Sequence, residues 1–408
     1  NFFCNMEKFK KLGINEQVLK AIKEAGFEEP SEIQGKTIPL VLQGRDIIAG
    51  SATGSGKTLV FAAGIIQNIQ EGYGVQALIL TPTRELAEQV AKSLIKFSKY
   101  KLLRVSAVYG GVSINPQIRE LRYADVVVGT PGRLLDCLER RALDLSRVKI
   151  LVLDEADRML DMGFMEDVSK IIRNCPEKRQ TLLFSATISQ DVFHIAKRYM
   201  KNPTEISAES YVDAEKLEQI YYCVEDNMKF SALVHLLKEE KSSLVMVFCN
   251  TRRTVDFVAK NLQKEGIRAL AIHGGHTQAR RDDVMRSFHS REVAVLVCTD
   301  VAARGLDIKN VSHVYNYDIP KTSKEYIHRI GRTARAGKEG KSISLISGRD
   351  YDNFRNVLKD SSIDIKEENL PEHINIIHIR AFHRTRTRRN FPKRSWNSNR
   401  NRRHSRRY

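Results

Sequence analysis

Features that would indicate a membrane or secreted protein are missing from this 408-residue chain. No uninterrupted apolar run reaches the ~18 residues that a membrane-spanning helix requires. The first residues, Asn1 to Met6, lack the basic stretch and the apolar core of a secretory signal. The sequence does not begin with Met, and Met6 is a candidate start. We therefore expect a cytoplasmic protein with no membrane partner.

Cysteine is sparse and shows no pattern. The six cysteines form no C-x-x-C pair, which argues against a disulfide framework or a zinc site. Cys249 and Cys298 lie inside apolar runs, so we expect both to be small buried side chains. Hydrophobic residues make up 42% and charged residues 28%, as in ordinary globular chains. The length favours two domains over one.

Acidic side chains are absent from the end of the chain. Arg380–Tyr408 holds 11 Arg and one Lys, which is +12 of the net charge of +18. Such a segment cannot bury a core, and we expect it to be disordered. Its arginines, with aromatic residues between them, suit nucleic-acid backbones and unstacked bases. A solubilising tail and a patch for membrane surfaces are the alternatives.

Short apolar runs alternate with helical patterns through most of the chain. This alternation predicts an α/β fold with parallel, doubly wound sheets, whose ligands bind at the carboxyl ends of the strands. The predicted strands of the first half are Ile47–Gly50, Ala77–Leu80, Arg104–Tyr109, Val126–Gly129, Ile150–Asp154 and Thr181–Ser185. Those of the second half are Leu244–Phe248, Ala269–Ile272, Val293–Val297, His313–Tyr317 and Ser342–Ile346.

The alternation of apolar runs and helical patterns is interrupted in the middle of the chain and again near its end. Between Pro203 and Lys216 polar and acidic residues replace the apolar periodicity. We expect a first domain at 1–207, a linker at 208–216, a second sheet domain at 217–370 and a basic tail at 371–408.

The clearest motif is a phosphate-binding loop. Residues 51–58 follow a short apolar run and precede a helical pattern. A strand, a Gly-rich turn and a helix start direct backbone N–H groups at anionic oxygens, and the lysine and hydroxyl add a charge and a Mg²⁺ ligand. A chance Gly/Ser loop before a helix is the alternative. The loop residues are Ser51, Ala52, Thr53, Gly54, Ser55, Gly56, Lys57 and Thr58.

A pair of acids follows a later strand. Asp154 and Glu155 come directly after the apolar run that starts at Ile150. A carboxylate at a strand tip beside a phosphate loop is where Mg²⁺ coordination is expected, and a neighbouring Glu can orient or deprotonate water. We expect Asp154 to hold Mg²⁺ through water and Glu155 to be the general base. Acids after strands also serve as helix N-caps.

Taken in order, these motifs resemble those of the DEAD-box ATP-dependent RNA helicases, which have two RecA-like domains. The resemblance covers about Phe9 to Leu370, and Ser51 is its one departure in the phosphate loop. The matching segments of the first half are residues 51–58, 82–87, 130–133, 154–157 and 185–187, and those of the second half are 247–251, 278–281, 299–307 and 328–335.

The resemblance implies an adenine-reading segment, the Q motif, at 7–35. Gln34 has an amide that can donate and accept hydrogen bonds at once, which suits the edge of adenine. Phe27 and Phe9 match aromatic positions of that segment, and core packing is the alternative for Phe27. These residues predict ATP as the nucleotide.

Residues of the second half complete the implied ATP site. Arg332 and Arg335 match arginine fingers that reach the γ-phosphate, although an arginine pair is ordinarily just solvated. Asp307 matches the ribose contact, and Gly305 permits close backbone approach. Ser185, Thr187 and His328 match residues that couple the nucleotide state to the rest of the protein.

A separate set matches the RNA-facing positions of the family. Small residues and phosphate donors position a strand without reading its sequence. An ordinary turn is the alternative at Gly110-Gly111, and a helix start is the alternative at Thr130. The set comprises Arg84, Gly110, Gly111, Thr130, Arg133, Gln278, Arg281, Thr299 and Arg304.

The sequence therefore predicts an RNA-stimulated, Mg²⁺-requiring ATPase that unwinds short RNA duplexes as its domains close. An ATP-gated RNA clamp and a DNA-acting relative are the rival hypotheses. RNA is the expected partner, in the setting of a ribonucleoprotein or RNA-decay complex, and the core is expected to be monomeric.

Overall fold

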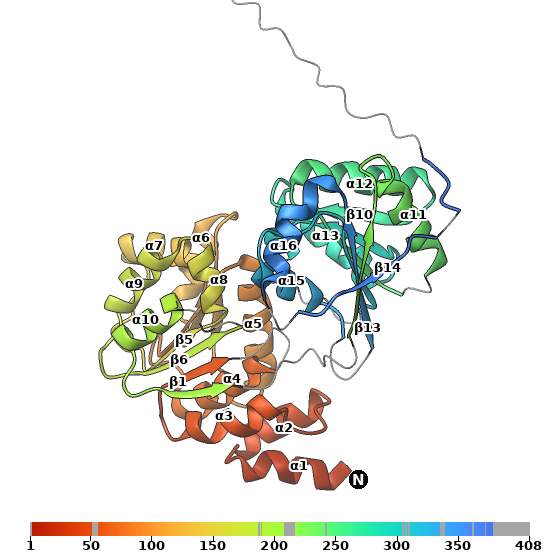
Figure 1. Ribbon diagram of the computed structural model, residues 1–408. Coiled ribbons are helices and arrows are strands. Elements are labelled where there is room, and N and C mark those ends of the chain that lie inside the picture. Colours follow the sequence, from red (N-terminus) through yellow and green to blue (C-terminus); the bar gives the residue numbers. More distant parts are fainter. Residues whose placement is uncertain are drawn as a thin grey trace, which may run out of the picture.

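The computed structural model consists of two parallel β-sheets, each flanked by helices (Figure 1). It describes residues 2–50, 56–186, 188, 190–207, 217–240, 243–303, 306, 308, 311–334, 339–360, 363–371 and 373–377. We call the part up to residue 207 domain 1 and the part from residue 217 domain 2.

Domain 1 alternates strands and helices as its sequence pattern predicts. Its strands are β1 (Ile47–Gly50), β2 (Ala77–Leu80), β3 (Val105–Val108), β4 (Val126–Gly129), β5 (Ile150–Leu153), β6 (Gln180–Ser185) and β7 (Thr204–Ser207). Its helices are α1 (Phe2–Lys11), α2 (Glu16–Glu24), α3 (Glu32–Leu42), α4 (Lys57–Asn68), α5 (Arg84–Phe97), α6 (Ile114–Leu121), α7 (Pro131–Glu139), α8 (Ala156–Asp161), α9 (Met165–Arg173) and α10 (Gln190–Tyr199).

The strands of domain 1 lie in the order β3-β4-β2-β5-β6-β1-β7, and every recorded pair is parallel. All carboxyl ends therefore meet at one edge. Side chains alternate between the two faces, so Ile47 and Ala49 join one core while Ile48 joins the other. Both faces are covered by helices, which explains why the strands read as continuous apolar runs.

Domain 2 repeats this architecture. Its sheet order, β10-β11-β9-β12-β13-β8-β14, matches that of domain 1 strand for strand. The strands are β8 (Leu217–Cys223), β9 (Val245–Phe248), β10 (Ala269–Ile272), β11 (Val295–Cys298), β12 (His313–Asn316), β13 (Gly340–Ile346) and β14 (Lys366–Glu368). The helices are α11 (Lys229–Glu239), α12 (Arg252–Lys264), α13 (Gln278–His289), α14 (Asp300–Ala303), α15 (Ser323–Ile330), the 3₁₀ turn η1 (Gly348–Asp350) and α16 (Tyr351–Leu358).

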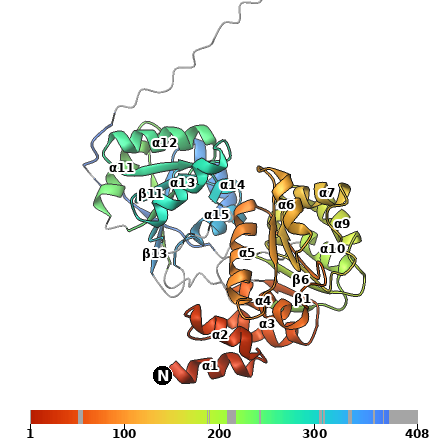
Figure 2. The ribbon, with the colours of Figure 1, turned by 180° about the vertical axis from the view of Figure 1, so that it is seen from behind.

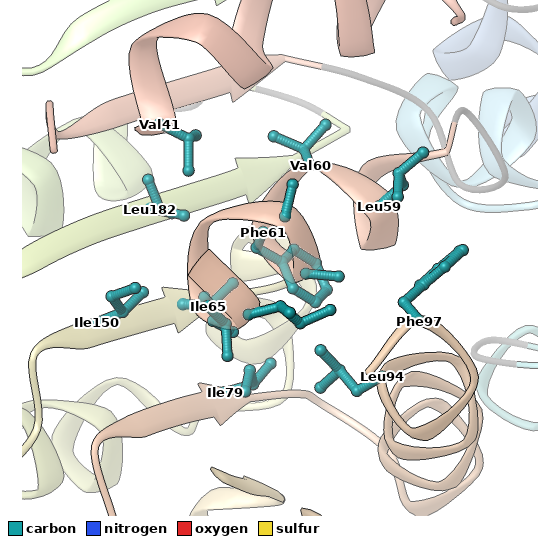
Figure 3. Packing of buried hydrophobic residues seen from close by; sticks show 14 of the residues in the cluster. Val41, Leu59, Val60, Phe61, Ile65, Ile79, Leu94, Phe97, Ile150 and Leu182 are labelled. Atoms are coloured by element: carbon teal, nitrogen blue, oxygen red, sulfur yellow. The ribbon is translucent and has the colours of Figure 1, made fainter. Parts of the chain in front are cut away.

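Helix α4, which follows the phosphate loop, is held from several sides. Figure 3 shows Phe61 and Ile65 of α4 among side chains of the sheet and of α5. The Phe61 and Phe184 rings pack with centroids 5.7 Å apart. A Cβ at Gly64 would lie 2.4 Å from Val41 Cγ1, so the glycine permits the close approach of α3. This packing fixes the start of α4 at the edge of the sheet.

The α/β class and the two parallel sheets are confirmed. The sequence analysis did not assign β7, β8 and β14 as strands. Exposed and buried residues alternate along β8, and the three residues of β14 are all exposed at the edge of the sheet. Residues beyond the predicted boundary at 370 pack against domain 2. Ile374 and Ile377 pack against the domain 2 core, and the Ile377 N–H donates to Ser231 Oγ at 3.0 Å. The linker 208–216 and residues 378–408 lie outside the described residues.

The two domains contact each other through charged side chains. Arg281 of α13 pairs with Glu85 of α5 at 2.7 Å, and Lys324 of α15 pairs with Asp161 of α8 at 3.1 Å. Figures 1 and 2 both show α15 on the side of domain 2 that faces domain 1. These two ion pairs join α13 to α5 and α15 to α8.

Candidate functional site

The phosphate loop can be followed from its last glycine. Residues 51–55 lie outside the described part of the chain. Gly56 precedes α4 with φ +88°, a left-handed conformation that favours glycine. A Cβ added there would lie 2.3 Å from Gln34 Nε2. The start of α4 at Lys57 and Thr58 is thus set by a glycine that cannot be replaced without strain.

Lys57 and Asp154 converge although they are far apart in the sequence. The first follows β1 and the second follows β5, with only β6 between these strands. Lys57 Nζ lies 3.8 Å from Asp154 Oδ1, and both side chains are almost fully buried. Burial raises the pKa of Asp154 to about 6, the Lys57 ammonium opposes this rise, and the Glu155 carboxylate adds to it. The site therefore brings charged side chains together in a position that is shielded from solvent.

The donor set here fits a magnesium ion. Asp154 Oδ1 is buried and has no hydrogen-bond partner among the described residues. Thr58 stands next to Lys57 at the start of α4 and offers a hydroxyl oxygen. Carboxylate and hydroxyl oxygens are hard ligands of the kind that Mg²⁺ prefers. Because both candidate donors, Asp154 and Thr58, are oxygen ligands, they fit the expected Mg²⁺.

Glu155 has a partner that the sequence analysis did not name. Its backbone is left-handed at φ 52°, which turns the chain sharply from β5 into α8. Arg158 Nη1 donates to Glu155 Oε2 at 2.7 Å, and both side chains are buried. Arg158 thus holds the carboxylate that is proposed as the base. The available signal was an acid and an arginine three residues apart, a spacing that brings side chains together on a helix.

Ser185 connects β6 to the start of α8. The Asp157 N–H donates to Ser185 Oγ at 3.3 Å, and the Ser185 side chain is fully buried. The hydroxyl therefore touches the same segment that carries Asp154 and Glu155. Thr187, the other hydroxyl of this predicted coupling motif, lies outside the described residues.

The predicted adenine-reading segment touches the last glycine of the predicted phosphate loop. Gln34 Nε2 donates to the Gly56 carbonyl at 3.1 Å, and Gln34 Oε1 accepts from the Ser31 N–H at 3.0 Å. Phe27 is half-buried and packs against Phe97 with ring centroids 5.9 Å apart. Phe9 is fully buried in the core, and its predicted ATP contact stays a prediction.

Domain 2 places a histidine opposite the acids of domain 1. His328 Nε2 lies 4.0 Å from Asp157 Oδ2. Arg332 is buried, and its Nη1 donates to the Leu306 carbonyl at 3.1 Å. The remaining members of the predicted set, Gly305, Asp307 and Arg335, lie outside the described residues.

Arg329, which the sequence analysis did not assign, anchors this segment from within. It is 1% exposed, and its guanidinium bonds both carboxylate oxygens of Asp300 at 2.6 and 2.7 Å and the Asp318 carbonyl at 2.6 Å. Arg329 also bonds Asn250 and Asn316. A buried arginine with this many partners fixes the end of α15, from which Arg332 follows.

The predicted RNA-facing residues of domain 1 occupy the neighbouring part of the same edge. Arg84 follows β2, Gly110 and Gly111 follow β3, and Thr130 follows β4. These three strands are contiguous in the sheet. Arg84 lies over the Tyr109 ring at 4.5 Å, and Arg133 Nη2 donates to the Val112 carbonyl at 2.9 Å. The edge is thus divided between the predicted RNA set and the predicted ATP set.

The RNA-facing set of domain 2 is only partly brought to this surface. Gln278 is half-buried at the start of α13 and donates to Asp282 Oδ1, whereas Thr299 is buried before α14. Arg281 pairs with Glu85 at 2.7 Å, so its charge is engaged by domain 1. Arg304 lies outside the described residues. The sequence analysis missed Glu85 because its partner lies in the other domain.

One cluster of potential metal ligands lies elsewhere in domain 2. Asp256, His273 and His276 each place a ligand atom within 4.8 Å of the others. The Gly275 N–H donates to His273 Nδ1 at 3.1 Å, so the ring proton sits on Nε2 and is donated to Asp256 at 2.9 Å. These two side chains satisfy each other without a metal. Cys249 and Cys298 are buried, as expected.

Comparisons with known proteins agree with this arrangement. A family model described as DEAD/DEAH box helicase matches residues 31–195, and one described as helicase conserved C-terminal domain matches 228–337. A protein named ATP-dependent RNA helicase CshA from Listeria monocytogenes is 48% identical over 353 residues, which is 86% of this chain and 68% of that protein. The chain belongs to the DEAD-box ATP-dependent RNA helicase family.

Two solved structures of a yeast protein resemble this chain to different degrees. Dbp5 of S. cerevisiae bound to RNA and ADP BeF3 is 33% identical, with a TM-score of 0.80 and coverage of 89% of this chain and 96% of that one. A Dbp5 variant bound to Nup159, Gle1, IP6 and ADP is 30% identical, covers 87% of this chain and 95% of that one, and scores 0.63. The helicase described here therefore has domains disposed more like those of the RNA-bound protein.

Among the described residues, no helix is long and apolar enough to cross a lipid bilayer.

Proposed function

We propose that this helicase hydrolyses ATP by closing its two domains around the nucleotide and a single RNA strand, and that closure separates short duplexes. The observation that carries this proposal is the division of the site. Lys57, Asp154 and Glu155 belong to domain 1, whereas His328 and Arg332 belong to domain 2. Neither domain alone holds both the phosphate-binding lysine and the arginines.

Each residue then has a distinct task. Lys57 and the N–H groups at the start of α4 hold the phosphates, because a cation and a helix N-terminus both favour anions. Glu155, held by Arg158 at 2.7 Å, orients the attacking water and accepts its proton. Arg332 and Arg335 offset the charge that develops on the γ-phosphate as it is transferred.

Magnesium is the expected metal. When bound, Mg²⁺ neutralises phosphate charge and orients the phosphoryl oxygens. Thr58 and Asp154 are the residues that would hold it, Asp154 through water. The buried Asp154 Oδ1, for which the described residues provide no hydrogen-bond partner, supports this assignment.

Contact with RNA is proposed to be independent of sequence. The edge of domain 1 after β2, β3 and β4 offers small residues and guanidinium groups, which suit phosphate and sugar. Equal affinity for unrelated single-stranded RNAs of one length would support this. A preference of more than about tenfold for one sequence would contradict it.

Outside the core, we propose that Arg380–Tyr408, with its 11 Arg and one Lys, tethers the helicase to structured RNA. A tether raises the local concentration of substrate at the closing site. The folded unit of domain 2 is proposed to extend to residue 377, because Ile377 still packs on its core.

The decisive test is strand displacement with matched RNA and DNA duplexes, with and without ATP. ATP-dependent displacement of short RNA duplexes, with little displacement of DNA, is the expected result. ATP-dependent RNA retention without displacement would instead indicate a clamp. Displacement of DNA alone would indicate a DNA-acting enzyme. Either of these two outcomes would overturn the proposed unwinding activity.

A further inference from the structure

Helices α8 and α15 face each other across the two domains with matched spacing. On α8, Asp157 and Asp161 are four residues apart, and on α15, Lys324 and His328 are four residues apart. Residues at this spacing lie on one face of a helix, one turn from each other. Each of these acidic side chains lies opposite one basic side chain. Asp157 lies 4.0 Å from His328, and Asp161 lies 3.1 Å from Lys324.

The contact between Asp161 and Lys324 involves both carboxylate oxygens. Lys324 Nζ is 3.1 Å from Oδ2 and 3.2 Å from Oδ1. Both side chains are about one-third exposed, at 30% and 37%. The pair can therefore form and break as the domains move, and solvent moderates its strength.

The four-residue spacing of Lys324 and His328 continues to Arg332, the predicted arginine finger. Arg332 is four residues beyond His328, and its N–H donates to the Arg329 carbonyl at 3.1 Å, which ties it to the end of α15. At the other helix, α8 begins directly after Asp154 and Glu155. A shift of one turn along α15 would displace Arg332 by ~5.4 Å. The register of α15 against α8 therefore decides whether Arg332 meets the acids of domain 1.

We propose that Asp161 and Lys324 are positioning residues that set this register. Their ion pair is one turn farther from the nucleotide than the pair of Asp157 and His328. It aligns α15 on α8 when the domains close, so that Arg332 reaches the γ-phosphate. The inference rests on the proposed closure mechanism, and it assigns a task to two residues that do not themselves touch ATP.

The test is a charge exchange in the full-length helicase. Asp161→Lys, Lys324→Asp and the double exchange are compared by steady-state ATPase measurements at saturating RNA. Each single change places like charges opposite each other and should lower kcat by about threefold to tenfold, the scale of an exposed ion pair and its reversal. The double exchange restores opposite charges and should recover most of the lost kcat, with KM for ATP little changed throughout.

Matched controls separate register from general charge effects. Glu166→Lys on α9 changes an exposed acid for which the structure gives no ion pair among the described residues. Lys359→Asp changes an exposed lysine at the C-cap of α16 that donates to Asn356 of the same helix. Neither should lower kcat. Thermal unfolding of all variants should remain within a few degrees of the parent, because the ion pair lies on the surface between domains.

The activities of the variants decide whether the Asp161–Lys324 ion pair sets the register of α15 against α8. If the single changes match the controls, or if the double exchange is no more active than the worse single variant, the register proposal is overturned. The failure of the proposed function would look different. In that case the parent protein itself would show no stimulation of its ATPase by RNA, whatever the variants do.

Discussion

At the scale of single residues, the site depends on charges held together where water is excluded. Asp154 and Lys57 are both almost fully buried, and the pKa of Asp154 rises to about 6 mainly through burial. Buried charges interact strongly because the surrounding dielectric is low. Glu155 is equally buried and is held by Arg158. The loss of one such group leaves its neighbours with uncompensated charge.

Lys57→Ala and Glu155→Gln should each lower RNA-stimulated ATP turnover by about a hundredfold or more. The lysine variant loses a phosphate contact, so its ATP affinity should also fall, whereas the glutamine variant keeps the shape of the site and should still bind ATP. Phosphate release and titration with a fluorescent nucleotide measure the two effects. Near-normal turnover in either variant would refute the site assignment.

Gln34→Ala should reduce discrimination between ATP and GTP by about tenfold, because a hydrogen-bonding amide rejects the wrong base edge more strongly than an apolar side chain does. Competition of GTP with a fluorescent ATP analogue measures this. In the structure the Gln34 amide also bonds Gly56, so ATP affinity should fall as well. An unchanged preference for ATP would count against adenine reading by Gln34.

At the scale of elements, the start of α4 is the structure on which the phosphate contacts depend. Gly56 has φ +88° and lies against Gln34. The rest of α4 is almost entirely buried. The helix therefore cannot shift to relieve strain at its first residue.

Gly56→Ala should weaken ATP binding by about tenfold or more, because a left-handed alanine costs about 1–3 kcal/mol and its Cβ would lie 2.3 Å from Gln34 Nε2. Gly35→Ala is the control. A Cβ at Gly35 meets nothing within 4 Å, and alanine in a helix is more stable than glycine. Titration with ATP and thermal unfolding compare the two, and equal ATP affinities would contradict the argument.

A buried ion pair joins α11 to η1 in domain 2. Lys229 is fully buried beside Asp350. Burial lowers the pKa of Lys229. Burial would raise the pKa of Asp350, but the Lys229 ammonium and the Ser347 hydroxyl and N–H hold it below its ordinary value. The charged pair therefore persists in the folded protein.

Asp350→Asn should lower the free energy of unfolding by about 3 kcal/mol, because it leaves the Lys229 ammonium buried without its counter-ion. Asp283→Asn removes an exposed partner of Arg286, at 67% exposure, and should change stability little. Chemical denaturation measures both. The argument fails if the two variants unfold at the same denaturant concentration.

At the scale of the whole molecule, the two domains have the same strand order, and many of the predicted site residues follow the carboxyl ends of strands. The ion pairs between Arg281 and Glu85 and between Lys324 and Asp161 join the domains. The basic tail, which lies outside the described residues, is proposed to add a second, electrostatic route to RNA. Core and tail can therefore be separated experimentally.

Deletion of Arg380–Tyr408 should lower RNA affinity at low salt by about tenfold or more and flatten its salt dependence, because fewer counter-ions are released from RNA. ATPase activity without RNA should be retained. A chain that ends at Asn369 is the comparison, since it also loses Ile374 and Ile377 from the core and should unfold at a lower temperature. RNA affinity that is unaffected at every salt concentration would give the tail another role.

The amino-acid sequence by itself determined the local features. Apolar runs fix most strands because a buried parallel strand must be apolar on both faces, and the Gly56-Lys57-Thr58 motif predicts a phosphate loop because a Gly-rich turn before a helix presents backbone N–H groups to anions. The sequence did not locate β14, because its three residues are all exposed. It also did not reveal that Phe9 is fully buried.

Only the tertiary structure decided the long-range partners. It placed Lys57 beside Asp154, Arg329 on Asp300, Glu85 on Arg281 and Asp161 on Lys324. No local pattern encodes these pairs, because each joins segments brought together by strand order or by the approach of two domains. A charged side chain on a helix looks solvent-exposed in the sequence, and its partner is defined only once the chain has folded.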